Sequence, residues 1–454
     1  MFNTSIQFKI LSLFIFLIGF SSCNDDEVTL YNDDDDAINN TFVLDFTKTF
    51  GGSNIDNAVA ILESNDGAYI ILGTTESLDG DVMGKTADDA DYWILKLSRT
   101  GDIIWQHTYG GTANDEASGI TKTNDGGYVI AGKSRSNDGD VSGNEGFFDY
   151  WIVKIDGEGT LVWEQNFGFV GSDQAFDVTS TQDGGFIATG VLDVSASGGQ
   201  GNAGRPNAAH AGGDYWAIKL NAAGDFVWSR YFGGSFTDTA HKAIETSTGD
   251  IVIIGFSDST DVDITNNKGA YDFWIVKINA SGDIIWENNY GGSEIDVAYD
   301  IIETTDNNYL IVGDTRSSDQ DVSEAKGNAD SWVIKISPTG DLIWQKSLGG
   351  TEFDTARSIS QMQNGNYVIA GTTRSNDGDI AEGNGLNDAW IIIIDQEGDL
   401  LYNEAFGGTN LDFGNSAVHT SDNKILLVGN TESTDGDIEI NKGIKDIFLV
   451  KLTQ

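Results

Sequence analysis

Aspartates recur along this sequence at a spacing that could coordinate a metal ion. Six segments read Ser-x-Asp-x-Asp followed by Val or Ile, and in five of them a third aspartate stands at the twelfth position counted from the first. Ca²⁺ takes about six to eight oxygen ligands, and carboxylates at this spacing could supply several of them. The five complete sets are Asp138, Asp140 and Asp149; Asp261, Asp263 and Asp272; Asp319, Asp321 and Asp330; Asp377, Asp379 and Asp388; and Asp435, Asp437 and Asp446.

The loops around these aspartates differ from an EF-hand. That motif needs glycine at position six, which only Gly143 supplies in the five sets, whereas their shared glycine stands at position nine. The residue after each pair is always aliphatic, as Val82 and Ile264 illustrate, which predicts a loop pinned to the core with its carboxylates outward. Two interpretations stay open: solvated structural loops, or sites for Ca²⁺, the one candidate cofactor.

A second aspartate set follows each predicted fourth strand, six residues past the first position of a Tyr/Phe-Gly-Gly turn or its variant. Short carboxylates at turns accept hydrogen bonds from nearby backbone N–H groups, so we interpret this set as structural caps. Both aspartate sets are expected on one face, which should then be strongly acidic. The caps are Asp56, Asp115, Asp173, Asp238, Asp296, Asp354 and Asp412.

Another slot, at the end of the predicted second strand, holds arginine in three units. Arg135, Arg316 and Arg374 occupy it, where other units place acidic residues such as Glu76. An arginine set could bind a carboxylate substrate, but pairing of each arginine with a neighbouring aspartate is the interpretation we favour.

One unit breaks the pattern. Its loop from Val191 to Gly213 is seven residues longer than its counterparts, lacks the aspartate pair and contains Arg205, Pro206 and His210. A long irregular loop is either functional or a tolerated insertion. We select these three residues as the candidate partner contact, because function tends to lie where a repeat is interrupted.

The elements that carry these residues are set by a repeat that runs through most of the chain. Aromatic residues fill two slots of each unit, and members of the first slot are 58 residues apart except for one interval of 65. Their position inside apolar strands predicts packing between units. The first slot holds Trp93, Trp151, Trp216, Trp274, Trp332, Trp390 and Phe448; the second holds Trp105, Trp163, Trp228, Trp286, Trp344 and Tyr402, with Phe46 ahead of them.

Each unit contains four short runs rich in β-branched and aromatic residues, separated by turns such as Asn124–Gly127. This pattern predicts four strands per unit and excludes helices of useful length. Residues 41–50 match a fourth strand and residues 446–452 a third, so the strands total 28, or seven times four. We therefore predict an all-β, seven-bladed β-propeller that is closed by the N-terminal strand in the last blade.

The motifs of one unit resemble a known repeat. Tyr109–Gly111, Asp115, Asp125–Gly127, Asp149 and Trp163 are similar to the bacterial β-propeller repeats of the SBBP type. That resemblance implies a propeller on an exported or surface protein and no particular activity. The Gly-x-x-x-Trp element also resembles the tryptophan-docking repeats of quinoprotein dehydrogenases, but no matching set of cofactor residues accompanies it.

The N-terminus resembles that of a lipoprotein. Cys23, the single cysteine, follows an apolar run with the length of a signal-peptide core. Phe20–Cys23 resembles a lipobox, although Phe20 departs from the usual aliphatic residue, and Asn24–Glu27 is similar to export signals of Bacteroidetes-type surface lipoproteins. The resemblance implies a signal peptide over 1–22, a lipidated Cys23 with an acidic tether over 23–40, and a propeller over 41–454 at the outer membrane surface. The alternative is a signal peptide cut elsewhere.

Composition narrows the function. Twenty-five basic and 71 acidic residues give a net charge of −46, which repels nucleic acid and leaves only the lipid anchor to contact a membrane. The histidines occupy four different repeat positions, so no acid–base constellation emerges. We predict a monomeric, non-enzymatic binding or scaffold module for a protein or glycan. The alternative is an exported enzyme, either a quinoprotein-like dehydrogenase or a hydrolase.

Overall fold

The computed structural model describes residues 42–202, 210–380 and 383–454. The chain separates into two units, Met1–Asn39 and Asn40–Gln454, and the described residues all belong to the second. They form 28 strands and one short helix, and no helix within these ranges is long and apolar enough to cross a membrane. The predicted signal peptide, Cys23 and tether lie outside the described residues, as do Arg205 and Pro206.

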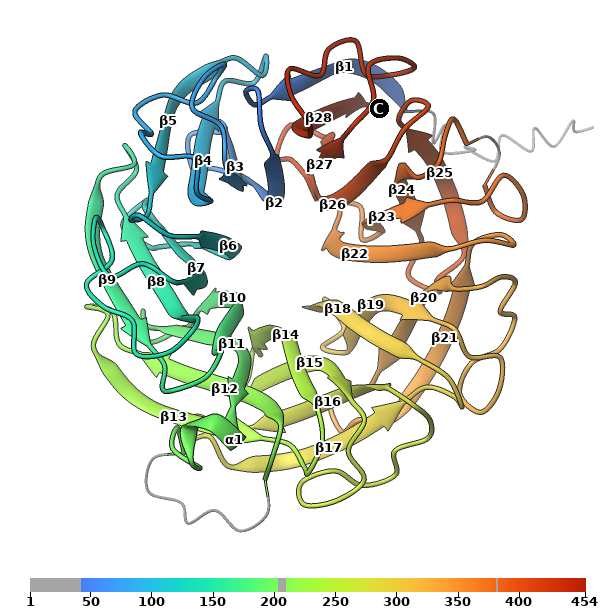
Figure 1. The fold of residues 1–454 in the computed structure, drawn as a ribbon. Coiled ribbons are helices and arrows are strands. Elements are labelled where there is room, and N and C mark those ends of the chain that lie inside the picture. The colour runs from blue at the N-terminus through green and yellow to red at the C-terminus, as the bar shows by residue number, and fades with distance from the viewer. Residues whose placement is uncertain (1–41, 203–209, 381–382) are drawn as a thin grey trace, which may run out of the picture. The chain divides into compact units, whose positions relative to one another are not determined.

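Seven four-stranded antiparallel sheets surround a central opening as blades (Figure 1). Blade I contains β2 (Asp56–Glu63), β3 (Tyr69–Thr75), β4 (Asp91–Leu97) and β5 (Ile103–Tyr109). Blade II contains β6 (Asp115–Lys122), β7 (Tyr128–Ser134), β8 (Asp149–Ile155) and β9 (Leu161–Phe167). Blade III contains β10 (Gln174–Ser180), β11 (Phe186–Asp193), the helix α1 (Val194–Ser197), β12 (Gly213–Leu220) and β13 (Phe226–Phe232).

The next three blades repeat the same order. Blade IV contains β14 (Asp238–Glu245), β15 (Ile251–Ser257), β16 (Asp272–Ile278) and β17 (Ile284–Tyr290). Blade V contains β18 (Asp296–Glu303), β19 (Tyr309–Thr315), β20 (Asp330–Ile336) and β21 (Leu342–Leu348). Blade VI contains β22 (Asp354–Gln361), β23 (Tyr367–Thr373), β24 (Asp388–Ile394) and β25 (Leu400–Phe406).

Blade VII takes its strands from both ends of the chain. It consists of β26 (Asp412–His419), β27 (Lys424–Thr431), β28 (Asp446–Thr453) and β1 (Val43–Phe50). β1 pairs antiparallel with β28, from Val43 opposite Thr453 to Phe50 opposite Ile447. The predicted seven-bladed propeller with four antiparallel strands per blade is confirmed.

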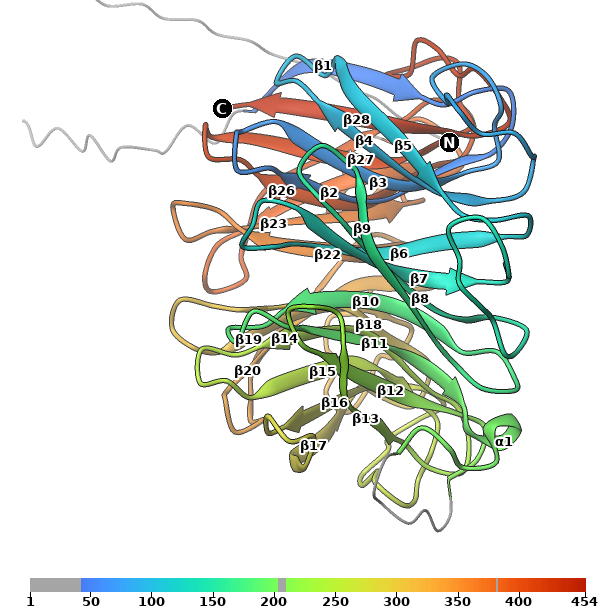
Figure 2. The ribbon, with the colours of Figure 1, turned by 90° about the vertical axis from the view of Figure 1, so that its left-hand side faces the viewer.

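The first aromatic slot packs the blades together. Its members are at most 3% exposed, and the tyrosine beside one of them reaches the next blade: the Tyr92 hydroxyl donates a hydrogen bond of 3.0 Å to the Trp151 carbonyl. Figure 2 shows neighbouring sheets packed face to face. The predicted packing role of this slot is confirmed, because these rings lie between sheets and away from solvent.

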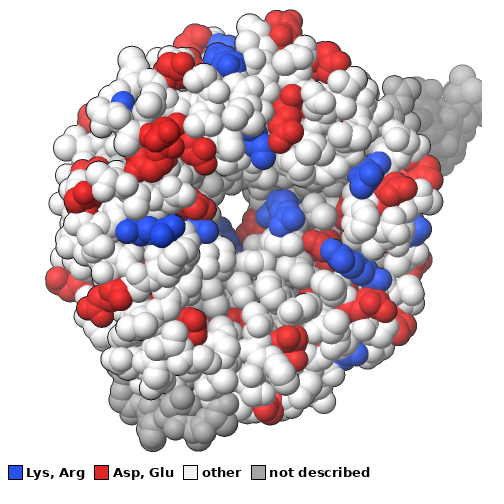
Figure 3. Space-filling model, viewed as in Figure 1, with Lys and Arg blue, Asp and Glu red and all other residues white. Residues whose placement is uncertain are grey.

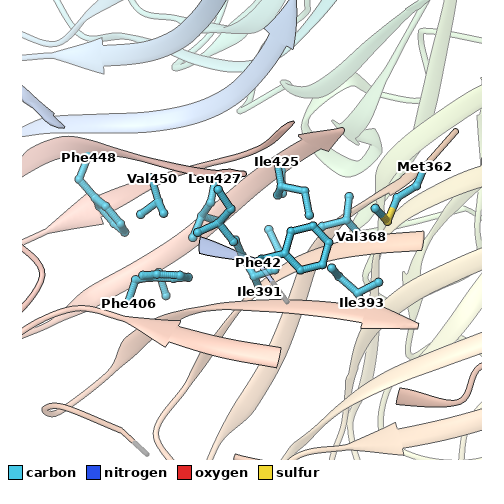
Figure 4. Close-up of a cluster of buried hydrophobic side chains, with 14 of the residues drawn as sticks. Phe42, Met362, Val368, Ile391, Ile393, Phe406, Ile425, Leu427, Phe448 and Val450 are labelled. Atoms are coloured by element: carbon cyan, nitrogen blue, oxygen red, sulfur yellow. The ribbon is translucent and has the colours of Figure 1, made fainter. Parts of the chain in front are cut away.

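Apolar clusters fill the spaces between blades, including the one next to β1. Figure 4 shows this cluster, in which Phe42 lies among side chains of blades VI and VII such as Ile391 and Leu427. The Phe42 and Tyr402 rings are 5.0 Å apart. The N-terminal segment therefore contributes to the same core as the C-terminal strands.

The innermost strand of every blade contains a β-bulge at one repeated position. In β6, Ala117 pairs with Gly132 and Gly119 with Ala131, so that Ser118 is left without a partner. A Cβ atom on Gly132 would lie 2.1 Å from the Glu116 carbonyl oxygen, which explains why glycine recurs opposite the bulge. The seven bulged residues are Val59, Ser118, Phe176, His241, Tyr299, Arg357 and Asn415.

Candidate functional site

The aspartates that follow the fourth strands are buried structural caps, as predicted. Asp354 is representative: it is fully buried, and its Oδ2 accepts hydrogen bonds of 2.7 Å from both the Gly350 N–H and the Ser375 hydroxyl. All seven accept a bond from the backbone N–H four residues earlier. Each therefore holds the turn that links two blades.

The paired aspartates brace the same turns from the neighbouring loop. Asp377 Oδ1 accepts a hydrogen bond of 2.8 Å from the Thr351 N–H, and Asp379 Oδ2 accepts one of 2.9 Å from the Gly349 N–H. All six pairs make this pair of contacts. The predicted pinning is also found, since the aliphatic residue after each pair is buried.

One oxygen of each closing aspartate lacks a hydrogen-bond partner among the described residues, as it does in the caps Asp115, Asp238 and Asp412. In Asp272, Oδ2 accepts a hydrogen bond from the Lys268 N–H, whereas Oδ1 is buried without a hydrogen-bond partner among the described residues. Burial, with the nearby Asp296 charge, raises the pKa of Asp272 to about 6. The same orphan oxygen occurs in Asp149, Asp330, Asp388 and Asp446.

These carboxylates are not arranged as a metal centre. Within residues 42–202, 210–380 and 383–454, no three Asp, Glu, His or Cys side chains are placed to hold a metal ion. Three of the second-position aspartates instead contact lysines: Asp321 with Lys268, Asp379 with Lys326 and Asp81 with Lys442. The hydrogen bonds and ion pairs of these aspartates support the interpretation as structural loops. Calcium binding stays a prediction.

The face that carries these loops is mixed in charge. Figure 3 presents it, with basic side chains among the acidic ones and several close to the central opening. The loops of this face carry more acidic than basic residues, in line with the expected acidic face, but lysines and arginines interrupt it. The first aspartate of each pair is exposed while it accepts its backbone hydrogen bond, and lysines from the loops of neighbouring blades contact three of the second aspartates.

The long loop of blade III is anchored by His210 at its end. His210 Nδ1 lies 2.5 Å from Asp214 Oδ2, and its ring packs edge-on against Tyr231 at 4.9 Å. Burial opposes the charged imidazole, but Asp214 and Asp263 outweigh it and raise the pKa of His210. His210 thus faces the protein interior, with 10% of its side chain exposed. Partner contact by this loop stays a prediction.

A pocket of about 750 Å³ lies where the long loop meets the turn between blades II and III. Phe169 replaces the second glycine of that turn, and its ring packs 5.9 Å from Trp216. Phe167 and Phe226, 6.2 Å apart, supply two further aromatic walls. The loop contributes Gln200 and Asn202, among other residues. The interruption singled out in the sequence therefore builds one wall of a cavity.

Polar groups without partners line the same pocket. Asp149 Oδ1, Asn166 Nδ2 and Asn202 Oδ1 are buried and have no hydrogen-bond partner within the described part of the chain. Burial raises the pKa of Asp149 to about 6. Unsatisfied buried polar groups are costly, so this pocket offers hydrogen bonds that a ligand can complete.

The bulged residues form a second asymmetric site around the channel, which sequence reasoning missed. The side chains in this slot differ in all seven blades, although the flanking strand positions repeat closely. Bulges re-aim side chains and are common beside functional sites. Alignment of the units on their capping aspartates would have found the slot, three residues further on, as the position with the greatest chemical variety.

Three of these residues stack on one another across blades IV, V and VI. The His241 and Tyr299 rings are stacked 4.8 Å apart at 11°, and the Arg357 guanidinium carbon lies 3.8 Å from the centre of the Tyr299 ring. Burial lowers the pKa of His241 to about 4. The imidazole is therefore neutral near pH 7.

The arginines of the second-strand slot do not pair with aspartates. The Arg135 guanidinium lies 4.1 Å from the centre of the Phe147 ring, and that of Arg316 lies 5.8 Å from the centre of the Phe353 ring. Among the described residues neither they nor Arg374 forms an ion pair. The favoured prediction of aspartate pairing is wrong here, because cation–π contacts hold two of these guanidinium groups.

Comparison with known proteins extends only to the fold. No family model and no curated protein matches the chain, so the SBBP resemblance stays a prediction. Solved structures with a similar fold include the Neurospora crassa Pan2 WD40 domain, at 8% identity over 90% of this chain and 95% of that one, with a TM-score of 0.47. Sqt1 from Chaetomium thermophilum matches at 10% identity over 91% and 100%, with a TM-score of 0.45.

A gluconolactonase from Xanthomonas campestris also matches, at 7% identity over 91% of this chain and 100% of that one, with a TM-score of 0.38. Propellers of different function thus stand among the similar structures. Likeness at this level carries no information about what this chain binds or catalyses.

Proposed function

We propose that this protein is a non-enzymatic binding module, held at the outer membrane surface by a lipid on Cys23, which binds a neutral glycan in the pocket beside the long loop of blade III. The observation that carries this proposal is the pocket itself. It lies at the one strong interruption of the repeat and combines aromatic walls with unsatisfied hydrogen-bonding groups.

The chemistry of the pocket suits a sugar. Phe226 and Phe167 offer apolar ring faces to the C–H face of a pyranose. Asn166 Nδ2 and Asn202 Oδ1 offer a donor and an acceptor to its hydroxyl groups. A raised pKa leaves the Asp149 carboxyl largely neutral at mildly acidic pH, which suits an uncharged ligand. Glycan is therefore favoured over protein as the ligand.

Glycan binding can be tested with a matched pair of variants at the same repeat position in two blades. Phe226 begins β13 in the pocket, and Ile284 begins β17 in the same repeat position outside it. The full chain, purified in detergent, is titrated calorimetrically with neutral hexasaccharides of glucose, xylose and mannose. We expect one of them to bind, Phe226→Ala to weaken it about 10-fold or more, and Ile284→Ala to leave it unchanged.

Two outcomes would overturn the glycan proposal. One is failure of every hexasaccharide to bind; the other is capture of a protein from outer-membrane extracts that depends on Phe226, which would make the pocket a protein-binding site. The anchor has its own test: Cys23→Ala should abolish labelling by a palmitate analogue and release the protein from membranes. Continued labelling would exclude Cys23 as the modified residue.

A further inference from the structure

The mouth of the central channel is a pocket free of acidic residues in a strongly acidic protein. It has a volume of about 520 Å³ and lies where the innermost strands begin, on the side of blades V to VII. None of its described lining residues is Asp or Glu, although the chain carries 71 acidic and only 25 basic residues. Arg357 and His241 lie in it beside Asn and Thr side chains.

Arg357 presents an unpaired cation to this pocket. Its side chain is exposed to the channel, and no carboxylate in the described part of the chain forms an ion pair with it. Its guanidinium stacks on Tyr299 at 3.8 Å. Stacking uses the face of the guanidinium, and a hydrogen bond with Tyr299 uses one of its N–H groups. A guanidinium has five N–H groups, so others remain for a bidentate contact with a carboxylate.

Asp314, the carboxyl group on which the Arg357 charge acts, forms no ion pair with Arg357 among the described residues. Asp314 is buried, and burial raises its pKa although the Arg357 and Arg316 charges both oppose that rise. Two guanidinium groups therefore act on one buried carboxyl. Asp177 and Asp300 also lie along the channel, but both contact Lys242, at 3.1 and 4.0 Å. Basic side chains lie beside the opening in Figure 3.

His241 adds a hydrogen-bond acceptor. Its Nδ1 lies 2.7 Å from the Ala298 carbonyl oxygen, which can only accept, so Nδ1 carries the proton and Nε2 is the free acceptor of the neutral ring. Phe176 and Tyr299 flank this imidazole, at 5.6 and 4.8 Å between ring centres. The pocket thus combines a carboxylate partner, a hydroxyl partner and aromatic surface.

We propose that the channel mouth binds a small hydroxy-carboxylate, with its carboxylate on Arg357 and a hydroxyl group on His241 Nε2. This site shares no lining residue with the pocket beside the long loop. It is therefore independent of the proposed glycan site, and its ligand differs from that one in charge.

The test compares D-galacturonate with D-galactose, which lacks the carboxylate, by calorimetry on the full chain at constant ionic strength. We expect galacturonate to bind and galactose to bind at least about 10-fold more weakly, since galactose lacks the charged acceptor of the bidentate contact. Arg357→Met should abolish this preference, and Arg357→Lys should restore only part of it. Affinity for galacturonate should fall as salt is raised.

Two control variants separate the proposals. Arg99→Gln removes the same charge from an exposed arginine that pairs with Asp422, and it should leave galacturonate affinity unchanged. Phe226→Ala should do the same if the two sites are independent. The proposal is overturned if galacturonate, glucuronate, lactate and citrate all fail to bind, if galactose binds equally well, or if Arg357→Met retains full affinity while its melting temperature matches the wild type.

Discussion

The hydroxyl of Thr47 donates a hydrogen bond of 2.8 Å to the carbonyl oxygen of Asp437, which lies 390 residues later in the chain. This contact joins β1 to the loop before β28, beside the antiparallel pairing of the two strands. The ends of the repeat array therefore meet in one blade, and the order of the last blade depends on a strand from the other end of the sequence.

Deletion of residues 42–50 is expected to destabilise the propeller severely. It exposes the edge of β28 and removes Phe42 and Phe50 from buried clusters, where a single Phe→Ala change costs about 3–5 kcal/mol. Thermal melting and size-exclusion chromatography should show a large fall in melting temperature and self-association. Deletion of residues 24–40 is the control; equal stability of both deletions would rule out a structural role for β1.

Replacement of the buried tryptophans should cost more than replacement of those in the second slot. Trp332 is fully buried, and its Nε1–H donates a hydrogen bond of 2.8 Å to Gln345 Oε1. Trp332→Ala should therefore lower the free energy of unfolding by about 3–5 kcal/mol. Trp286 is only half-buried, and Trp286→Ala should cost less. Trp332→Phe should be the mildest change at its slot, because Phe448 fills that slot in blade VII. Urea unfolding provides the measurement, and equal losses at both slots would contradict the packing argument.

Asp377 distinguishes the turn brace from a calcium ligand. Asp377→Ala removes the acceptor of the Thr351 N–H and should cost about 1 kcal/mol, whereas Asp377→Asn keeps that acceptor and should cost less. Melting curves with millimolar Ca²⁺ and with chelator complete the test. The brace predicts curves independent of calcium; a rise in melting temperature with calcium that Asp377→Asn abolishes would establish the metal site instead.

Stability should be greatest near pH 4. Burial raises the pKa of Asp173 to about 7 and that of Asp149 to about 6, so the folded state binds more protons than the unfolded state between about pH 4 and 7, and stability falls as pH rises through this range. Asp125 acts in the opposite sense: its hydrogen bond to Lys154 lowers its pKa to about 2, and its contribution is lost below about pH 4.

Thermal melts from pH 3.5 to 8.5 should therefore show a maximum and a decline toward alkaline pH. Asp149→Asn should make that decline shallower, because one of the buried acids no longer ionises. Asp125→Asn is the control and should alter only the acidic side. A melting temperature that is higher at pH 8 than at pH 5 would show that these buried carboxyl groups do not set the pH dependence.

The architecture could be predicted from the sequence because the same pattern of strands, turns and aromatic residues occurs in all seven units. Strand composition, turn glycines and the spacing of Trp93, Trp151 and their successors all agree on one blade design, and the count of 28 strands then determines seven blades. The capping role of Asp354 and its equivalents was predictable for the same reason, since a short carboxylate after a tight turn meets nearby N–H groups.

Contacts between loops were harder to predict. The partner of Asp377 is a backbone N–H 26 residues earlier, and the aromatic partner of Arg135 comes from a different part of its own loop. Spacing along the chain left metal coordination, ion pairing and hydrogen bonding as competing explanations. Only the positions of the loops, with lysines such as Lys442 folded among the carboxylates, decided between them.

The sequence by itself determined the blade, the number of blades and the place where the repeat is interrupted, because these depend on periodicity along the chain. The tertiary structure decided what that interruption builds and which side chains meet at the channel. His241, Tyr299 and Arg357 are each 58 residues apart, yet ring formation and a bulge in each inner strand bring them into one stack. A contact of this kind depends on the direction of side chains in three dimensions, which no spacing along a single chain records.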